Sequence, residues 1–174
     1  MTGKEFLNNV TKGKVDLLGL LLEALAATGA DYCVIGGLAV NAYAEPVVSL
    51  DLDLVVASDR ATALRKTAEA RGMTSKEFEH SVNLAMAGSD LRIQLQTDAR
   101  YQEFIPRAAV QEVLGYRMKV ACLEDVLAGK VWAYTDESRR RSKRQKDLAD
   151  IMRLVETHPR LAALLPPAVR ALMA

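Results

Sequence analysis

Residues 32–56 read YCVIGGLAVNAYAEPVVSLDLDLVV, and most of the fold prediction rests on them. An apolar run ends at Gly36-Gly37, and a second apolar run carries Asp51 and Asp53 one residue apart. Side chains alternate between the two faces of a strand, so leucines occupy one face and both aspartates the other. Two partly buried carboxylates on one face repel each other unless they are hydrogen-bonded, paired or bound to a metal. The stretch therefore predicts positive charge beside Asp51 and Asp53.

The composition is that of an ordinary globular domain. The chain has 174 residues, of which 50% are apolar and 26% charged, and its formal net charge is +1. This length suits one domain, or one domain with a small appendage, and is long enough to bury a core. The even balance of charge provides no global attraction to nucleic acid or to a membrane surface.

The cysteines and the apolar segments predict a soluble cytoplasmic protein with no membrane partner. Cys33 and Cys122 lie in apolar surroundings without metal-site spacing, which is typical of reduced core residues. The first 16 residues lack the apolar core of a signal peptide. The longest apolar stretch, LLGLLLEALAA, is too short to span a bilayer and carries Glu23.

Hydrophobic periodicity predicts an α+β fold. The expected helices cover residues 15–27, 38–44, 58–70, 123–134 and 142–156, with a short tail helix after Pro159. The expected strands cover residues 32–35, 50–56, 82–87, 91–95, 110–113 and 117–121, and the last four form two hairpins. Ser58 and Asp59 predict the cap of the third helix, and Pro46 ends the second. We expect a strand-rich catalytic core over residues 1–121 and a helical C-terminal portion, 122–174, packed on it.

The glycine pair and the aspartate pair of residues 32–56 are more specific in combination than either is alone. Alone, Gly-Gly is usually a plain turn, and two aspartates on a strand can simply be solvated. In combination, backbone amides at Gly36 and Gly37 would hold phosphates beside the carboxylate pair, because glycine lets a ligand approach the backbone. Mg²⁺, which binds carboxylate and phosphate oxygens together, would supply the positive charge. This equipment serves phosphoryl or nucleotidyl transfer.

The order IGG, 13 residues, DLDL resembles the signature of the polymerase-β-like nucleotidyltransferase superfamily. Further along, LRIQLQTD, KVACLEDVLAGKVWAY and SKRQKDLADIMRL resemble the AbiEii-type nucleotidyltransferases, which include toxins of type IV toxin–antitoxin systems. The resemblance covers roughly residues 30–157. It implies the nucleotidyltransferase fold, a mixed β-sheet with flanking helices. It also implies a nucleoside triphosphate donor with Mg²⁺, tRNA or a protein as acceptor, and an antitoxin protein as partner.

The resemblance also implies roles for particular residues. Asp51 and Asp53 would bind Mg²⁺ and act in catalysis, and Ser49 would join Gly36 and Gly37 in binding the nucleotide. Lys130 matches a lysine that stabilises phosphate charge, and Asp147 and Asp150 match a KDxxD-like helix. From the residues alone, Lys130 can equally be a solvated lysine. Asp147 and Asp150 can equally pair along their helix with Arg144 or Arg153.

Gln94 departs from the superfamily pattern. It occupies the expected place of a third carboxylate and keeps one neutral oxygen without a negative charge. Asp90 and Asp98 are each four residues away, about 13 Å along a strand, too far to replace it. Leu38 stands where relatives often carry a small hydroxyl residue. Gln94 therefore favours the alternative of a catalytically weakened nucleotide-binding or partner-binding module.

Basic residues are concentrated in one segment, since Arg139–Lys146 holds six positive charges in eight residues. A charge run of this kind is often a solvated helix start. The functional interpretation is a contact surface for tRNA, another polyanion or an acidic partner. Antibiotic-modifying nucleotidyltransferases share the opening motif, but nothing here is specific to an aminoglycoside acceptor. We predict transfer of a nucleoside monophosphate from a triphosphate to an acceptor hydroxyl, with release of pyrophosphate.

Overall fold

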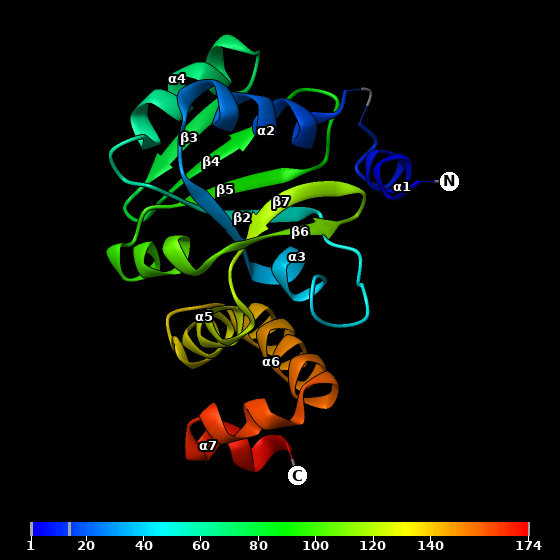
Figure 1. Cartoon of the computed structure of the whole chain (residues 1–174), viewed down its shortest axis with the longest axis vertical. Helices are drawn as coiled ribbons and strands as arrows, with labels where there is room; N and C mark the ends of the chain where they lie inside the picture. Colours follow the sequence, from blue (N-terminus) through cyan, green and yellow to red (C-terminus); the bar gives the residue numbers. More distant parts are fainter. Residues whose placement is uncertain (1, 14, 174) are drawn as a thin grey trace.

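The structure is a computed structural model that describes residues 2–13 and 15–173. A mixed seven-stranded sheet lies at its centre, in the order β3-β4-β5-β2-β1-β7-β6 (Figure 1). The strands are β1 Tyr32–Ile35, β2 Asp51–Val56, β3 Thr74–Phe78, β4 Ser81–Ala85, β5 Arg92–Gln96, β6 Ala109–Val113 and β7 Tyr116–Val120. Strand β2 runs antiparallel to β1 and parallel to β5, while β7 runs parallel to β1. The predicted α+β class with a mixed sheet is confirmed.

Helices cover the sheet from two sides. They are α1 Gly3–Val10, α2 Leu17–Thr28, α3 Gly36–Val40, α4 Ala61–Ala70, α5 Leu123–Thr135, α6 Arg141–Thr157 and α7 Pro167–Arg170, with the 3₁₀ helices η1 Ala99–Arg107, η2 Pro159–Leu164 and η3 Ala171–Met173. Figure 1 shows α2 and α4 above the sheet and α5 and α6 below it, with α3 between the sheet and the lower helices. None of the helices in the described residues is long and apolar enough to cross a lipid bilayer.

The central strands explain why the carboxylate pair sits on a rigid support. Leu52, Leu54 and Val34 are fully buried, as expected for strands covered on both faces. In β2, half-buried and buried residues alternate only at the start of the strand, where Asp51 and Asp53 are half-buried. The predicted division of the strand, with leucines on one face and aspartates on the other, is confirmed.

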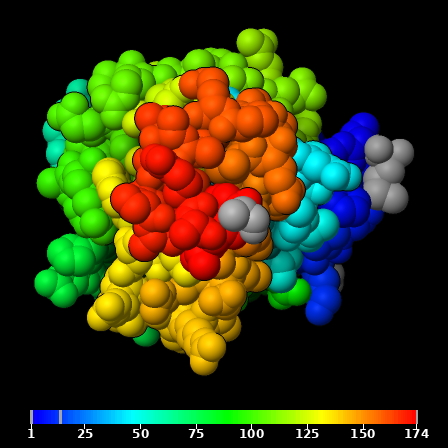
Figure 2. Space-filling view, turned by 90° about the horizontal axis from the view of Figure 1, so that it is seen from below, coloured from blue at the N-terminus to red at the C-terminus, as the bar shows by residue number. Residues whose placement is uncertain are grey.

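The helix after the two glycines is shorter than predicted and ends at Val40. The side chain of Asn41 closes the loop that follows, accepting a hydrogen bond from the Val47 N–H at 3.0 Å and donating one to the Val47 carbonyl at 2.8 Å. Arg153 of α6 holds the same loop through Asn41 and the carbonyl of Glu45. In Figure 2 the loop (cyan) accordingly lies beside the orange surface of the C-terminal helices.

One further prediction about local structure was wrong, and three elements were missed. Ser58 and Asp59 do not cap the next helix, which begins at Ala61 with Arg60 in the N-cap position. The helix Gly3–Val10, the polar strand Thr74–Phe78 and the 3₁₀ helix Ala99–Arg107 were not predicted. The omission of η1 matters for function, because it carries a residue of the site described next.

Candidate active site

The carboxylate pair lies against the turn between β1 and α3. Gly36 has φ +71°, and a Cβ atom at this position would collide with the carboxylate of Asp53. Only glycine fits there, for both reasons. A Cβ atom on Gly37 would lie 3.8 Å from the hydroxyl of Ser49. That hydroxyl accepts a hydrogen bond from the Asp51 N–H at 3.2 Å and so fixes the start of β2.

The predicted neighbourhood of Gly36, Gly37, Ser49, Asp51 and Asp53 is therefore present in the structure. The functional roles assigned to these residues stay predictions.

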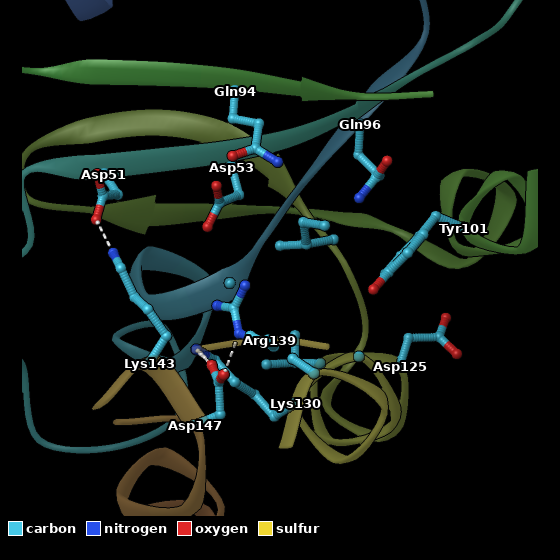
Figure 3. Close-up of a pocket in the computed structure, with 15 residues that line it drawn as sticks. Asp51, Asp53, Gln94, Gln96, Tyr101, Asp125, Lys130, Arg139, Lys143 and Asp147 are labelled. Atoms are coloured by element: carbon cyan, nitrogen blue, oxygen red, sulfur yellow. Dashed lines mark hydrogen bonds and ion pairs between the residues drawn. The ribbon is translucent and has the colours of Figure 1, made fainter. Parts of the chain in front are cut away.

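A pocket opens between this face of the central strands and the helices α5 and α6 (Figure 3). It has two adjoining parts, which share Asp51, Asp53, Lys130, Arg139, Lys143 and Asp147. We call the first part the amide chamber, since Gln94, Gln96 and Tyr101 line it. We call the second the basic chamber, since Lys146 and Arg153 line it together with Gly37 and Ser49.

The helical wall of the pocket is a buried ion-pair network. The Nζ atom of Lys130 lies 3.0 Å from Asp147 and 2.7 Å from Asp150, and the Nε atom of Arg139 lies 2.7 Å from Asp147. Lys130 is 8% exposed and Asp147 only 2%. Burial alone would lower the pKa of Lys130, but the carboxylates of Asp150 and Asp147 outweigh it and raise that pKa. Lys130 is therefore a charged, paired residue.

These contacts correct two of the alternatives drawn from the sequence. Lys130 is not a solvated lysine. Asp147 does not pair with Arg144 or Arg153, because its partners come from α5 and from the segment before α6. The predicted helical pair between Asp150 and Arg153 is present, at 2.7 Å.

The two aspartates of the pair have different surroundings. Asp51 faces Arg92, whose Nε atom is 2.7 Å from its carboxylate, and Lys143, whose Nζ atom is 3.4 Å away. No ion pair among the described residues includes Asp53. Burial raises the pKa of Asp53 to about 6, with Lys130 lowering it and Asp51 raising it further. The protein thus supplies part of the predicted positive charge, and it supplies it to Asp51.

Gln94 stands beside Asp53, as predicted. The two residues are partners in the parallel register of β5 with β2, and both line the amide chamber. Asp90 pairs with Lys12 and Asp98 with Arg100, so neither aspartate replaces a carboxylate at this position.

Sequence reasoning missed several residues of the pocket. Gln96 lies two residues after Gln94, and strand alternation alone would have placed both side chains on the same face. Tyr101 comes from η1, where it is 7% exposed and packs edge-to-face against Trp132 at a ring-centroid distance of 5.3 Å. Arg139 and Lys143 were seen only as members of a charge run, and the structure places both in the pocket (Figure 3).

The carboxylate oxygens of Asp51 and Asp53 are of the kind that Mg²⁺ binds. Within residues 2–13 and 15–173, no group of three or more His, Cys, Asp or Glu side chains is placed to hold a metal ion by itself. Mg²⁺ is usually held by one or two carboxylates together with substrate phosphates, rather than by a cage of protein ligands. Asp51 and Asp53 offer hard oxygens on one face, and within the described part of the chain no cation forms an ion pair with Asp53. The residues present fit the ion.

Comparison with known structures defines the class of protein. A crystal structure of ANT(2")-Ia in complex with adenylyl-2"-tobramycin superimposes with a TM-score of 0.67 at 18% identity, covering 90% of this chain and 94% of that chain. The lincosamide antibiotic adenylyltransferase LnuA, in a lincomycin-bound crystal structure, gives a TM-score of 0.56 at 9% identity over 79% of this chain and 96% of that chain. An antigenic nucleotidyltransferase-like protein from Paracoccidioides brasiliensis gives 0.51 at 18% identity over 80% of this chain and 75% of that chain. At these identities the likeness establishes the nucleotidyltransferase fold.

The family follows from the sequence itself. The family model described as nucleotidyl transferase AbiEii toxin, type IV TA system, matches residues 20–174, and the chain belongs to this family. The predicted family resemblance is confirmed. A comparison with curated proteins gives no match.

Proposed function

We propose that this chain transfers a nucleoside monophosphate from a nucleoside triphosphate to an acceptor hydroxyl. The bond between the α- and β-phosphates breaks, the acceptor oxygen bonds to the α-phosphorus, pyrophosphate leaves, and the hydroxyl proton passes to solvent. One observation carries the proposal. Asp51 and Asp53 lie beside Gly36 and face the basic side chains of the C-terminal helices across a single pocket.

The basic chamber suits the triphosphate. Lys143 and Lys146 bring positive charge to it, opposite the hydroxyl of Ser49 and the backbone at Gly37, whereas Arg153 is already paired with Asp150. Charged donors bind phosphate oxygens through short, strong hydrogen bonds. Asp51 and Asp53 would hold Mg²⁺, which when bound neutralises phosphate charge. Lys130 is fixed by two carboxylates, so its contribution is to orient the helical wall and to add positive potential.

The amide chamber suits the acceptor, since it lies beyond Asp53 on the side of Gln94 and Gln96. Arg139, Arg140 and Arg141 are exposed at the start of α6, beside the pocket. A polyanion is attracted to such a group, so we favour tRNA over a protein as acceptor. Membership of a toxin family supports a toxin role with an antitoxin protein as partner.

The test is pyrophosphate release from each of the four ribonucleoside triphosphates, with Mg²⁺ and total tRNA, together with transfer of labelled nucleotide to the RNA. The double variant Asp51→Asn, Asp53→Asn should lose activity by at least about a thousandfold, the scale of losing an essential electrostatic group. Lys119→Met, remote from the pocket, is the matched control. Equal rates in the double variant and the wild type would overturn the proposal.

Gln94 supports a second candidate, a nucleotide-binding module with weakened catalysis, because a neutral amide stands beside Asp53. Such a module would still be stabilised by Mg²⁺ and a triphosphate, by about 2.7 kcal/mol at 100 times the dissociation constant. It would release pyrophosphate only slowly. Gln94→Asp should then tighten Mg²⁺ binding and speed pyrophosphate release. A slower release in this variant would show that the reaction needs the glutamine side chain.

A further inference from the structure

Asp51 has two cationic partners that come from different sides of the site. Arg92 contacts one carboxylate oxygen at 2.7 Å, and Lys143 contacts the other at 3.4 Å. Arg92 belongs to the sheet, where it is the register partner of Asp51 on the neighbouring strand. Lys143 reaches across the pocket from α6, as Figure 3 shows. The charge of Asp51 is therefore balanced before any ligand arrives.

The contact of Lys143 is the looser of the two. Its distance of 3.4 Å is long for a hydrogen bond to a carboxylate, and the side chain is 39% exposed. Lys143 lines both chambers, and Lys146, three residues along the same helix, lines the basic chamber. An ammonium group on a four-carbon stem moves between such neighbouring positions by rotation of its side chain. Lys143 can thus exchange Asp51 for a phosphate oxygen without a change in the backbone.

We propose that Lys143 is a displaceable counter-ion that couples metal binding to phosphate binding. It balances Asp51 in the free protein, yields this carboxylate to the divalent cation, and then contacts phosphate in the basic chamber. The inference rests on the proposed function, because it concerns the same cation and triphosphate. A divalent cation at Asp51 repels the ammonium group, while phosphate attracts it. Each ligand therefore favours the other through Lys143, in addition to their direct attraction.

The test uses Mn²⁺ and inorganic tripolyphosphate as probes, so that neither nucleobase nor acceptor needs to be known. In Lys143→Met, the affinity for Mn²⁺ without phosphate should rise about fivefold, because a competing charge near the surface is lost. With Mn²⁺ saturating, the affinity for tripolyphosphate should fall about tenfold, because a charge-assisted contact is lost. Titration calorimetry measures both affinities. A purely structural role of Lys143 would not move them in opposite directions.

Two matched variants separate the two halves of the inference. Arg92→Met removes a partner of Asp51 that belongs to the sheet, so it should raise Mn²⁺ affinity and leave tripolyphosphate affinity unchanged. Lys146→Met removes a basic residue of the basic chamber, so it should lower tripolyphosphate affinity and leave Mn²⁺ affinity unchanged. Lys143→Met alone should show both changes.

The outcomes distinguish this inference from the proposed function. If the wild type binds both probes and Lys143→Met changes neither affinity, or changes both in the same direction, Lys143 is not a displaceable counter-ion and the proposed function stands. If the wild type and all three variants bind neither probe, the proposed function fails and the inference fails with it.

Discussion

Asp53 and Asp147 line the same pocket in opposite electrostatic surroundings. Asp147 is 2% exposed and contacts two cations, Lys130 at 3.0 Å and Arg139 at 2.7 Å. Asp53 lies on the facing wall, where burial raises its pKa to about 6 and Asp51 adds to the rise. The first carboxylate is satisfied by the protein, and the second is kept at the pocket without such a partner.

This difference separates a wall that maintains the fold from a wall that is available to a ligand. A buried carboxylate between two cations has little to gain from a further cation, and breaking such a pair leaves uncompensated charge. Where a half-buried carboxylate has a raised pKa, binding of a cation stabilises its charged form. We therefore expect ligands to bind at the face of the sheet that carries Asp51 and Asp53, while the helical wall keeps the opposite side of the pocket rigid.

The largest expected effect is on the helical wall. Asp147→Asn removes the charge that balances Lys130 and Arg139, so we expect a loss of about 3 kcal/mol in the free energy of unfolding, measured by urea denaturation. Asp150→Asn is the control, since Asp150 also contacts Lys130 at 2.7 Å but is more exposed, and its loss should be smaller. Exposed ion pairs contribute less than about 1 kcal/mol. A loss in that range for Asp147→Asn would contradict the claim that the ion pairs of the helical wall stabilise the fold.

The next effect is at Asp53 and has the opposite sign. Because the pKa of Asp53 is about 6 in the folded protein and 3.8 ordinarily, the charged form is disfavoured by folding. Its stability contribution is present below pH 4 and is lost as the pH rises through 6. A shift of this size corresponds to about 3 kcal/mol, and water at the half-buried carboxylate screens part of it. Without divalent cations, Asp53→Asn should therefore raise the unfolding free energy by roughly 2 kcal/mol at pH 7.5.

The pH profile decides this prediction. The gain from Asp53→Asn should disappear near pH 4, where the wild-type carboxyl is protonated, and Mg²⁺ should reduce it at pH 7.5 by binding the wild type. Thermal unfolding of the wild type and of Asp53→Asn at pH 4 and 7.5, with and without Mg²⁺, measures the gain under each of these four conditions. A gain that is the same at both pH values would show that ionisation of Asp53 is not its cause.

The smallest effect is expected at a carboxylate outside the pocket. Asp31 pairs with Lys119 at 2.5 Å, but the two side chains are 51% and 45% exposed. Lys119→Met should change the unfolding free energy by about 0.5 kcal/mol or less, because water already solvates both charges. Chemical denaturation in low and high salt provides the measurement. A loss as large as that of Asp147→Asn would show that burial does not explain the difference between the pairs.

The sequence was most informative where structure depends on neighbours along the chain. The strand 32–35, the glycine turn, the strand with Asp51 and Asp53, and the two hairpins follow from periodicity and from the conformational freedom of glycine. Polar Thr74–Phe78 was missed because an exposed edge strand has no apolar alternation. The helix after the two glycines was predicted too long, because the apolar sequence 38–44 does not show that the side chain of Asn41, at the C-cap of α3, bonds to Val47 in the following loop.

The family, the α+β class and the face of the strand that carries both aspartates could be predicted from the sequence, because motif spacing and alternation are local properties. Which charges meet across the pocket depended on the tertiary structure. It buried Lys130 between Asp147 and Asp150, brought Lys143 to Asp51 from 92 residues away, and placed Tyr101 in the pocket. Helical spacing was enough to predict the pair Asp150–Arg153. Pairs between separate elements depend on distance and burial in space, and no pattern along the chain contains either quantity.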